Sequence, residues 1–210
     1  MHKTIYQAFS DISQDWNTSG AVLEIGAMPS KKSLLNMPAL SGASEKVGLN
    51  LDGPHDFADF HIVKGDVNNM DCFEDDRFDL VLCNAVLEHN PYFWQAIEEI
   101  KRVTRPGGLI VIGTPGYTST RSDRWFTGFF RNIPLVRKLR HNRYLNLFFT
   151  TTFTYKVHFG PGDYYRFSPD TYRDVFMAGL EEVSITSLML PPRIIGCGIK
   201  PVMAEPATAS

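Results

Sequence analysis

The feature that most constrains the fold is a series of short apolar runs, each followed by glycine or a polar residue. The run FDLVLC, residues 78–83, is apolar at almost every position, which is typical of a strand buried on both faces of a parallel sheet. Downstream, apolar residues recur at helical spacing in residues 93–103, with charged residues between them. Strands that alternate with helices predict a doubly wound α/β domain. The five runs cover residues 21–25, 46–51, 61–64, 78–83 and 109–113.

Further elements complete the predicted domain. Residues 3–14 are expected to form a leading helix, and Asn-Pro at 90–91 supplies the cap and first position of the helix after the fourth strand. Ser-Pro-Asp at 168–170 marks another helix start. Two closing strands over 183–190 and 194–199 bring the predicted sheet to seven, mostly parallel strands.

Residues 117–160 interrupt this regular pattern. Seven lysines and arginines lie between residues 121 and 143, opposed by one acid, and aromatic residues are interleaved among them. We interpret the segment as an inserted cap of one or two short helices within a single domain spanning residues 1–210. Three roles remain open for it: a lid over the active site, a surface at 121–149 that meets anionic lipid or a lipid-linked acceptor, and a nucleic-acid surface.

Composition narrows the class of protein. The net charge of -2 gives no attraction of the whole protein to nucleic acid, so we expect no nucleic-acid partner. Three cysteines lie scattered without metal or redox spacing, so no metal site is expected. The N-terminus lacks the apolar core of a signal peptide, which predicts a cytoplasmic protein, with membrane association only through the insert. Residues 201–210 are rich in Pro and Ala and are expected to form a disordered tail.

Ligands of open α/β sheets bind beyond the carboxyl ends of the strands, so this rule selects candidate site residues before any motif is considered. Carboxylates and amides dominate the selection. Such groups suit a ligand with ribose hydroxyls, an exocyclic amine and a cationic centre. The selected residues are Glu24, Gly26, Asn50, Asp52, Asp66, Asn84 and Thr114.

The loop after the first strand, GAMPS at residues 26–30, separates two cofactor classes. A dinucleotide carries a pyrophosphate, and its turn needs further glycines so that backbone N–H groups approach the phosphates. Met28 and Pro29 are poor there, because one is bulky and the other has no N–H. A methyl donor without phosphates needs only close approach beside the first glycine, so this loop favours S-adenosylmethionine.

The successive motifs resemble those of class I S-adenosylmethionine-dependent methyltransferases of the type 11 kind. They are VLEIG, VGLNLDG, KGDV, FDLVLCNAVLEH and EEIKRVTRPGGLIVIGTP, within residues 20–116, and the spacing of the last two is the most specific. The segment HFGPGDYYRFSPDTYRDVFMAGLEEVSI is similar to the closing part of bacterial members linked to sugar or cell-surface glycan modification. The resemblance implies a Rossmann-like sheet and S-adenosylmethionine as cofactor.

The resemblance also implies roles for the first two motifs. Glu24 and Gly26, with Ala27 beside them, would border the methionine part of the donor. The family's usual acid at the end of the second strand aligns with Asn50. Asp52 follows two residues later, so it is favoured for the ribose hydroxyls, with Asn50 as a weaker partner.

The later motifs supply the remaining candidates. The resemblance implies that Asp66 accepts from the adenine amine with Val67 packing beside it, and that Asn84 closes the site. Two histidines are candidate general bases, although a structural role competes for the first. A turn of aromatic and basic residues is a candidate acceptor pocket, or else packs under the cap. These residues are His89 and His158 for the base, and Tyr164, Tyr165 and Arg166 for the acceptor.

The sequence therefore predicts methyl transfer from S-adenosylmethionine to a small-molecule or glycan acceptor, expected at oxygen. Two alternatives stay open. The GAMPS loop suggests a non-catalytic relative that binds a partner through the same fold. The basic aromatic insert suggests a membrane-peripheral methyltransferase that acts on a lipid-linked glycan.

Overall fold

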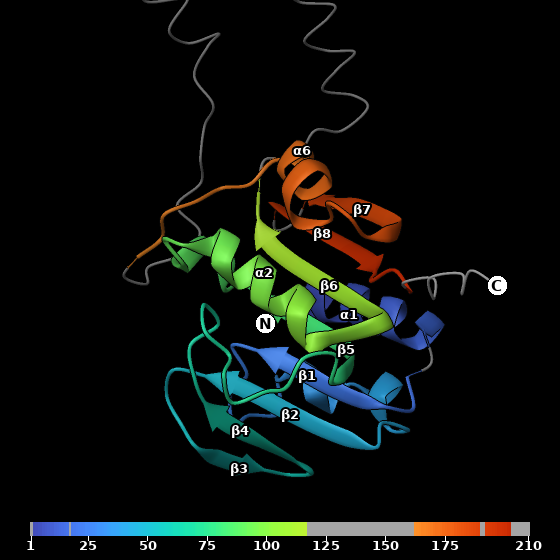
Figure 1. Cartoon of the computed structure of the whole chain (residues 1–210), viewed down its shortest axis with the longest axis vertical. Coiled ribbons are helices and arrows are strands. Elements are labelled where there is room, and N and C mark those ends of the chain that lie inside the picture. The colour runs from blue at the N-terminus through green and yellow to red at the C-terminus, as the bar shows by residue number, and fades with distance from the viewer. Residues whose placement is uncertain (1, 17, 117–161, 190–191, 203–210) are drawn as a thin grey trace, which may run out of the picture. The chain divides into compact units, whose positions relative to one another are not determined.

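The computed structural model describes residues 2–16, 18–116, 162–189 and 192–202 (Figure 1). The chain divides into two units. The first comprises Met1–Thr118 and Tyr164–Ser210, and the second comprises Ser119–Asp163. The account below concerns the first unit. The predicted cap at 117–160, its proposed membrane surface at 121–149 and the tail beyond residue 202 lie outside the described residues.

An eight-stranded mixed sheet forms the centre of this unit (Figure 1). Its order is β3-β4-β2-β1-β5-β6-β8-β7, so the direction of strand progression reverses between β1 and β5. The neighbouring strands β4, β2, β1, β5 and β6 run parallel, whereas β8 pairs antiparallel with both β6 and β7. The strands are β1 (Ala21–Ile25), β2 (Glu45–Asn50), β3 (His55–Phe57), β4 (Phe60–Lys64), β5 (Phe78–Asn84), β6 (Thr104–Pro115), β7 (Glu181–Met189) and β8 (Pro192–Ile199).

All seven strands expected from the sequence are present, and the predicted number is wrong by one. The additional strand, β3, is an edge strand that forms a tight antiparallel hairpin with β4. Its turn contains Ala58 at φ 53° and Asp59, which forms a 2.7 Å ion pair with Lys46 Nζ. A three-residue strand carries too little alternation to be distinguished from the turn that precedes it.

Apolar side chains leave the sheet in two directions and build two separate hydrophobic clusters. Leu23 and Ile25 of β1 join the cluster on the side of helix α2 (Phe93–Val103). Val22 joins the cluster beneath helix α1 (Lys3–Trp16), whose Phe9 is fully buried. Figure 1 shows α2 in front of the sheet and α1 behind it, so the sheet is covered on both faces as predicted.

The connections between strands depart from a regular helix-per-crossover pattern. Between β1 and β2 the chain forms two 3₁₀ turns, η1 (Leu34–Asn36) and η2 (Pro38–Leu40), instead of an α-helix. Between β5 and α2 it forms a third turn, η3 (Leu87–His89). The predicted cap at Asn90 is wrong, because Tyr92 is the N-cap of α2 and Asn90 ends η3.

The helix start predicted at 168–170 is confirmed. The Ser168 hydroxyl accepts a hydrogen bond from the Thr171 N–H and caps α6 (Pro169–Thr171). A π-helical turn, η4 (Tyr172–Phe176), continues from it. Tyr172 is fully buried, and its hydroxyl donates to the Ile194 carbonyl oxygen, which fixes this segment against β8.

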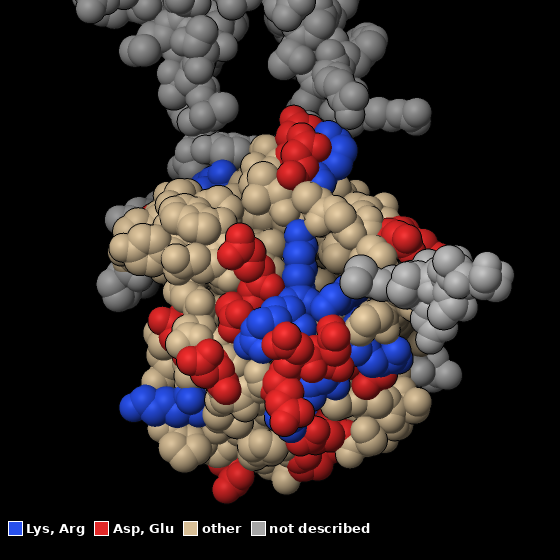
Figure 2. Space-filling view, in the orientation of Figure 1, with Lys and Arg blue, Asp and Glu red and all other residues tan. Residues whose placement is uncertain are grey.

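Charged side chains of both signs are intermingled on the face shown in Figure 2. Arg102 pairs with Glu99 and Asp75, and Lys200 pairs with Asp76. The Lys200 ammonium also donates to carbonyl oxygens at the end of α2, where a positive charge is favoured. Among the described residues, no helix is long and apolar enough to cross a membrane.

Candidate functional site

A pocket of about 390 Å³ lies beyond the carboxyl ends of β1, β2 and β4. The segment between β5 and α2 supplies the remaining wall, so the pocket borders the reversal point of the strand order, where open α/β sheets bind ligands. Its volume falls within the range typical of small-ligand sites. The lining residues are Ile25, Gly26, Leu49, Asn50, Leu51, Gly65, Asp66, Val67, Asn68, Val86, His89, Asn90, Pro91 and Tyr92.

The turn after β1 requires glycine for two independent reasons. Gly26 has φ 77°, a conformation that side chains of L-residues rarely adopt. A Cβ at this position would also lie 2.5 Å from Cγ2 of Val86 in the opposite wall. The N–H groups of Gly26 and Ala27 both donate to the Leu49 carbonyl oxygen, at 2.8 and 3.3 Å. These amides hold the turn against β2.

Asn50 lines the pocket at the end of β2 and joins two loops. Its Nδ2 donates to the Ala27 carbonyl oxygen at 2.7 Å and lies 3.8 Å from the Met28 sulfur. Its Oδ1 accepts from the Asp52 N–H at 3.0 Å. Asn50 therefore connects the GAMPS loop to the turn after β2.

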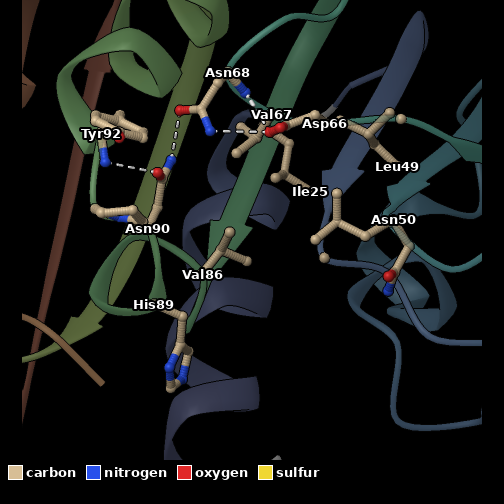
Figure 3. A pocket seen from close by; sticks show the side chains of 14 residues that line it. Ile25, Leu49, Asn50, Asp66, Val67, Asn68, Val86, His89, Asn90 and Tyr92 are labelled. Carbon is tan, nitrogen blue, oxygen red and sulfur yellow. Dashed lines mark hydrogen bonds between the residues drawn. The ribbon is translucent and has the colours of Figure 1, made fainter. Parts of the chain in front are cut away.

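A chain of hydrogen bonds crosses from the β4 loop to the wall before α2 (Figure 3). Asp66 Oδ1 accepts from the backbone N–H of Asn68 at 2.9 Å and from its Nδ2 at 3.0 Å. Asn68 Oδ1 then accepts from Asn90 Nδ2 at 2.8 Å. Asn90 Oδ1 in turn accepts from the Tyr92 N–H at 2.9 Å. The four residues form one continuous polar wall, beside which Val67 packs (Figure 3).

Glu24 is not among the lining residues, although it was predicted to border the donor. Its carboxylate is buried and accepts from the Ser33 hydroxyl and from the Leu35 N–H at 3.3 Å. Burial raises the pKa of this carboxyl above its ordinary value, and these hydrogen bonds partly oppose the shift. Glu24 thus holds the loop between β1 and η1.

Three further predicted cofactor contacts also lie outside the lining. The side chain of Asp52 is 93% exposed and lies 3.6 Å from Nε2 of His55. Ala27 is fully buried in the cluster beneath α1. Asn84 ends β5, and its buried Oδ1 has no hydrogen-bond partner within the part of the chain that the structure describes.

The predicted catalytic and acceptor residues are placed as follows. His89 lines the pocket, below Val86 in Figure 3, whereas His158 lies outside the described residues. Tyr164 is exposed, and its N–H donates to the Glu88 carbonyl oxygen at 2.8 Å.

Tyr165, the second residue of the predicted acceptor turn, lies close to the same wall. The Tyr165 hydroxyl donates to the carbonyl oxygen of Pro91, a lining residue. Arg166 donates to the Tyr165 carbonyl oxygen. None of the three acceptor candidates lines the pocket itself.

The most informative residues that the sequence did not single out for the site are Asn68, Asn90 and Tyr92. The Asn-Pro pair at 90–91 draws attention to Asn90, but this pattern predicts only a helix cap. Asn68 follows Asp66 by two residues, where short polar side chains commonly bond back to the backbone. Exposed Tyr92 directly precedes α2. Turn chemistry was visible, but the contact between Asn68 and Asn90 depends on the fold.

The fold and pocket define a ligand-binding domain of the doubly wound α/β class. Comparison with protein families makes this more specific: residues 38–112 match the family described as "Methyltransferase domain". This match begins after the GAMPS loop. A stretch of 40 residues is 50% identical to an uncharacterized methyltransferase of Mycobacterium leprae, which covers 19% of this chain and 15% of that relative. The chain thus matches only a small part of the length of this curated relative.

Solved structures extend the similarity over most of the chain. Phosphoethanolamine N-methyltransferase 2 of Haemonchus contortus, in complex with S-adenosyl-L-methionine, aligns with TM-score 0.59 and 13% identity over 95% of this chain and 53% of that one. The YcgJ protein of Bacillus subtilis aligns with TM-score 0.57 and 14% identity over 94% and 100%. At such identities the likeness shows the fold. The predicted Rossmann-like sheet is confirmed, and residues 38–112 are similar to the methyltransferase-domain family.

Proposed function

We propose that this chain transfers a methyl group from S-adenosylmethionine to a small-molecule or glycan acceptor, at an oxygen atom. The observation that carries the proposal is the convergence of Gly26, Asn50 and Asp66 in one pocket, from the ends of three neighbouring parallel strands. The methyltransferase match over residues 38–112 supports the reaction type. S-adenosylmethionine is also the ligand named for the Haemonchus contortus structure.

The turn after β1 supports a donor without phosphates. A pyrophosphate needs free backbone N–H groups at the start of a helix. Here the N–H groups of Gly26 and Ala27 donate to Leu49, Pro29 has none, and that of Ser30 donates to the Met28 carbonyl oxygen. The chain then continues into the short 3₁₀ turn η1. This geometry disfavours a dinucleotide and leaves close approach of the backbone as the contribution of the turn.

The lining residues suggest how the donor is held. We assign Asp66 as the acceptor for the exocyclic amine of adenine and Ile25 and Val67 as apolar contacts to the ring, because all three line the pocket. We assign the ribose to Asn50 in preference to Asp52, because Asn50 lines the pocket. When bound, the donor supplies an activated methyl group on sulfur, and the protein contributes alignment of that methyl with the acceptor oxygen.

The acceptor side is proposed from the sequence resemblance. Tyr164 and Tyr165 donate to carbonyl oxygens of Glu88 and Pro91, and Arg166 follows them in the chain. The insert at 117–160 follows the end of β6. A hydroxyl acceptor requires that a proton leave as the new bond forms. His89 and His158 remain the candidate bases. A His89→Gln variant that keeps donor affinity but loses methyl transfer would support the base role of His89.

Calorimetry with the full chain tests the proposal directly. We expect binding of S-adenosylmethionine and of its product S-adenosylhomocysteine. Asp66→Asn should weaken product binding by about tenfold or more, because a hydrogen bond to a charged acceptor is lost. Asp52→Asn is the matched control and should leave the affinity unchanged within about twofold, because Asp52 does not line the pocket.

Three outcomes would contradict the proposal. If the chain does not bind S-adenosylmethionine at millimolar concentration, the methyltransferase activity is excluded and a non-catalytic binding protein is favoured. Unchanged affinity in Asp66→Asn would overturn the assignment of Asp66 to the adenine amine, and weakened binding in Asp52→Asn would overturn the choice of Asn50 over Asp52 for the ribose. The membrane-peripheral alternative is tested separately by flotation with anionic liposomes at low salt, where an intact protein that stays unbound excludes it.

A further inference from the structure

We infer that Asn68 and Asn90 form a positioning pair that fixes the Asp66 carboxylate and thereby sets the selectivity of the pocket for an adenine amine. The inference rests on the proposed function and goes beyond it, because neither asparagine was assigned a role in binding. Its basis is the directional chain of hydrogen bonds that joins Asp66, Asn68, Asn90 and the Tyr92 N–H (Figure 3).

The direction of each bond in the chain is determined by its fixed end. The Tyr92 backbone N–H is only a donor, so the group of Asn90 that faces it must be the carbonyl oxygen. The NH₂ group of Asn90 therefore faces Asn68, and the side-chain oxygen of Asn68 accepts its hydrogen bond. Asn68 consequently presents NH₂ to Asp66. A backbone group therefore determines which group faces the carboxylate.

This order leaves one carboxylate oxygen of Asp66 for a ligand. Both hydrogen bonds from Asn68 end on Oδ1, and Oδ2 accepts none from the residues that the structure describes. With Oδ1 held by two donors, rotation of the carboxylate is restricted and Oδ2 keeps one orientation. An acceptor held in this way favours an amine on the purine ring and disfavours a carbonyl oxygen at the same position.

The surroundings of the pair support a positioning role. Asn90 is 6% exposed, and a buried amide with both groups bonded is costly to disturb. The two asparagines come from opposite walls, the loop after β4 and the turn before α2, so their bond also sets the spacing of these walls. The neighbouring Asn69 instead donates from its side chain to Asp71 and does not line the pocket.

The test compares two ligands that differ at the purine amine, S-adenosylhomocysteine and S-inosylhomocysteine, by calorimetry with the full chain. The wild-type protein should prefer the adenine ligand by about tenfold or more. Asn90→Asp offers only acceptors to Asn68, so the Asn68 amide reverses and its oxygen faces Asp66. We expect the preference to fall to about threefold or less in this variant. Asn68→Ala, which is less buried, should reduce the preference similarly.

Asn69→Ala is the matched control and should keep the wild-type preference. A general loss of stability weakens both ligands together, so the ratio of the two affinities reports the positioning role specifically. If the wild type prefers adenine and both Asn68→Ala and Asn90→Asp keep the full preference, the positioning pair is overturned while the proposed function stands. If Asn90→Asp does not fold, Asn68→Ala alone decides. If the wild type binds neither ligand, the proposed function itself falls.

Discussion

The side-chain amide of Asn50 donates to the carbonyl oxygen of Ala27, and this 2.7 Å bond ties the end of β2 to the loop after β1. Asn50 occupies the place where the resemblance led us to expect an acid. An aspartate there would have no donor for the Ala27 carbonyl oxygen. The asparagine and the GAMPS loop therefore depend on each other.

Replacing Asn50 with alanine should weaken binding of S-adenosylhomocysteine by about tenfold, because the loop loses its tie and the pocket loses a polar contact. Calorimetry measures the change. Asn36→Ala is the control, because Asn36 Nδ2 holds the Ser30 carbonyl oxygen of the same loop at 3.0 Å without lining the pocket. Equal losses in both variants would mean that loop order alone matters and that Asn50 makes no contact with the ligand.

Gly26→Ala should abolish detectable donor binding while the protein stays folded. Alanine is strained at φ 77°, and its Cβ meets Val86 Cγ2 at 2.5 Å. Adding Val86→Ala to this variant removes the contact and leaves the backbone strain. We therefore expect partial recovery of binding in the double variant, measured by calorimetry. Full recovery would show that only the steric conflict with Val86 requires glycine.

The sequence predicted the strands better than the directions of the side chains at their ends. Runs such as residues 78–83 are recognisable as strands from the sequence, because both faces of the strand are buried and nearly every residue is apolar. At the end of β1, however, Val22 and Leu23 join opposite clusters, so Glu24 falls on the α1 side and Ile25 on the pocket side. Strict alternation would have placed Glu24 away from the pocket. The prediction followed the motif instead.

The remaining differences depend on contacts between distant parts of the chain. Gly26, Asn50, Asp66, Val67 and His89 were predicted and do meet in the pocket. The pairing of Asn68 with Asn90 joins two walls that are 22 residues apart in sequence, and no local pattern indicates it. The 3₁₀ turn η1 is likewise held by the buried bonds of Glu24 to Ser33 and Leu35.

Tyr172→Phe should lower the free energy of unfolding by about 1–3 kcal/mol. The buried Tyr172 hydroxyl donates to the Ile194 carbonyl oxygen at 3.0 Å and lies 2.8 Å from the Thr114 hydroxyl. Removing it leaves both groups buried with one partner fewer. Urea denaturation measures the loss, and Tyr164→Phe should change stability by less than about 0.5 kcal/mol because its ring is exposed. Equal effects in the two variants would contradict this account.

Glu24→Gln should change how stability depends on pH. Burial raises the pKa of the Glu24 carboxyl above its ordinary value of 4.5, so above that pH the folded state holds a proton that the unfolded state has released. Wild-type stability therefore falls as pH rises from 4.5 through the raised pKa, by about 1.4 kcal/mol for each unit of difference. Glutamine does not titrate, so urea denaturation should show that the free energy of unfolding of the variant rises relative to that of the wild type across this pH window. Ser33→Ala removes a hydrogen bond that lowers the pKa of Glu24. The stability of this variant should therefore continue to fall to a higher pH than that of the wild type. Parallel curves for wild type and Glu24→Gln would show that the carboxyl is not shifted upward by burial.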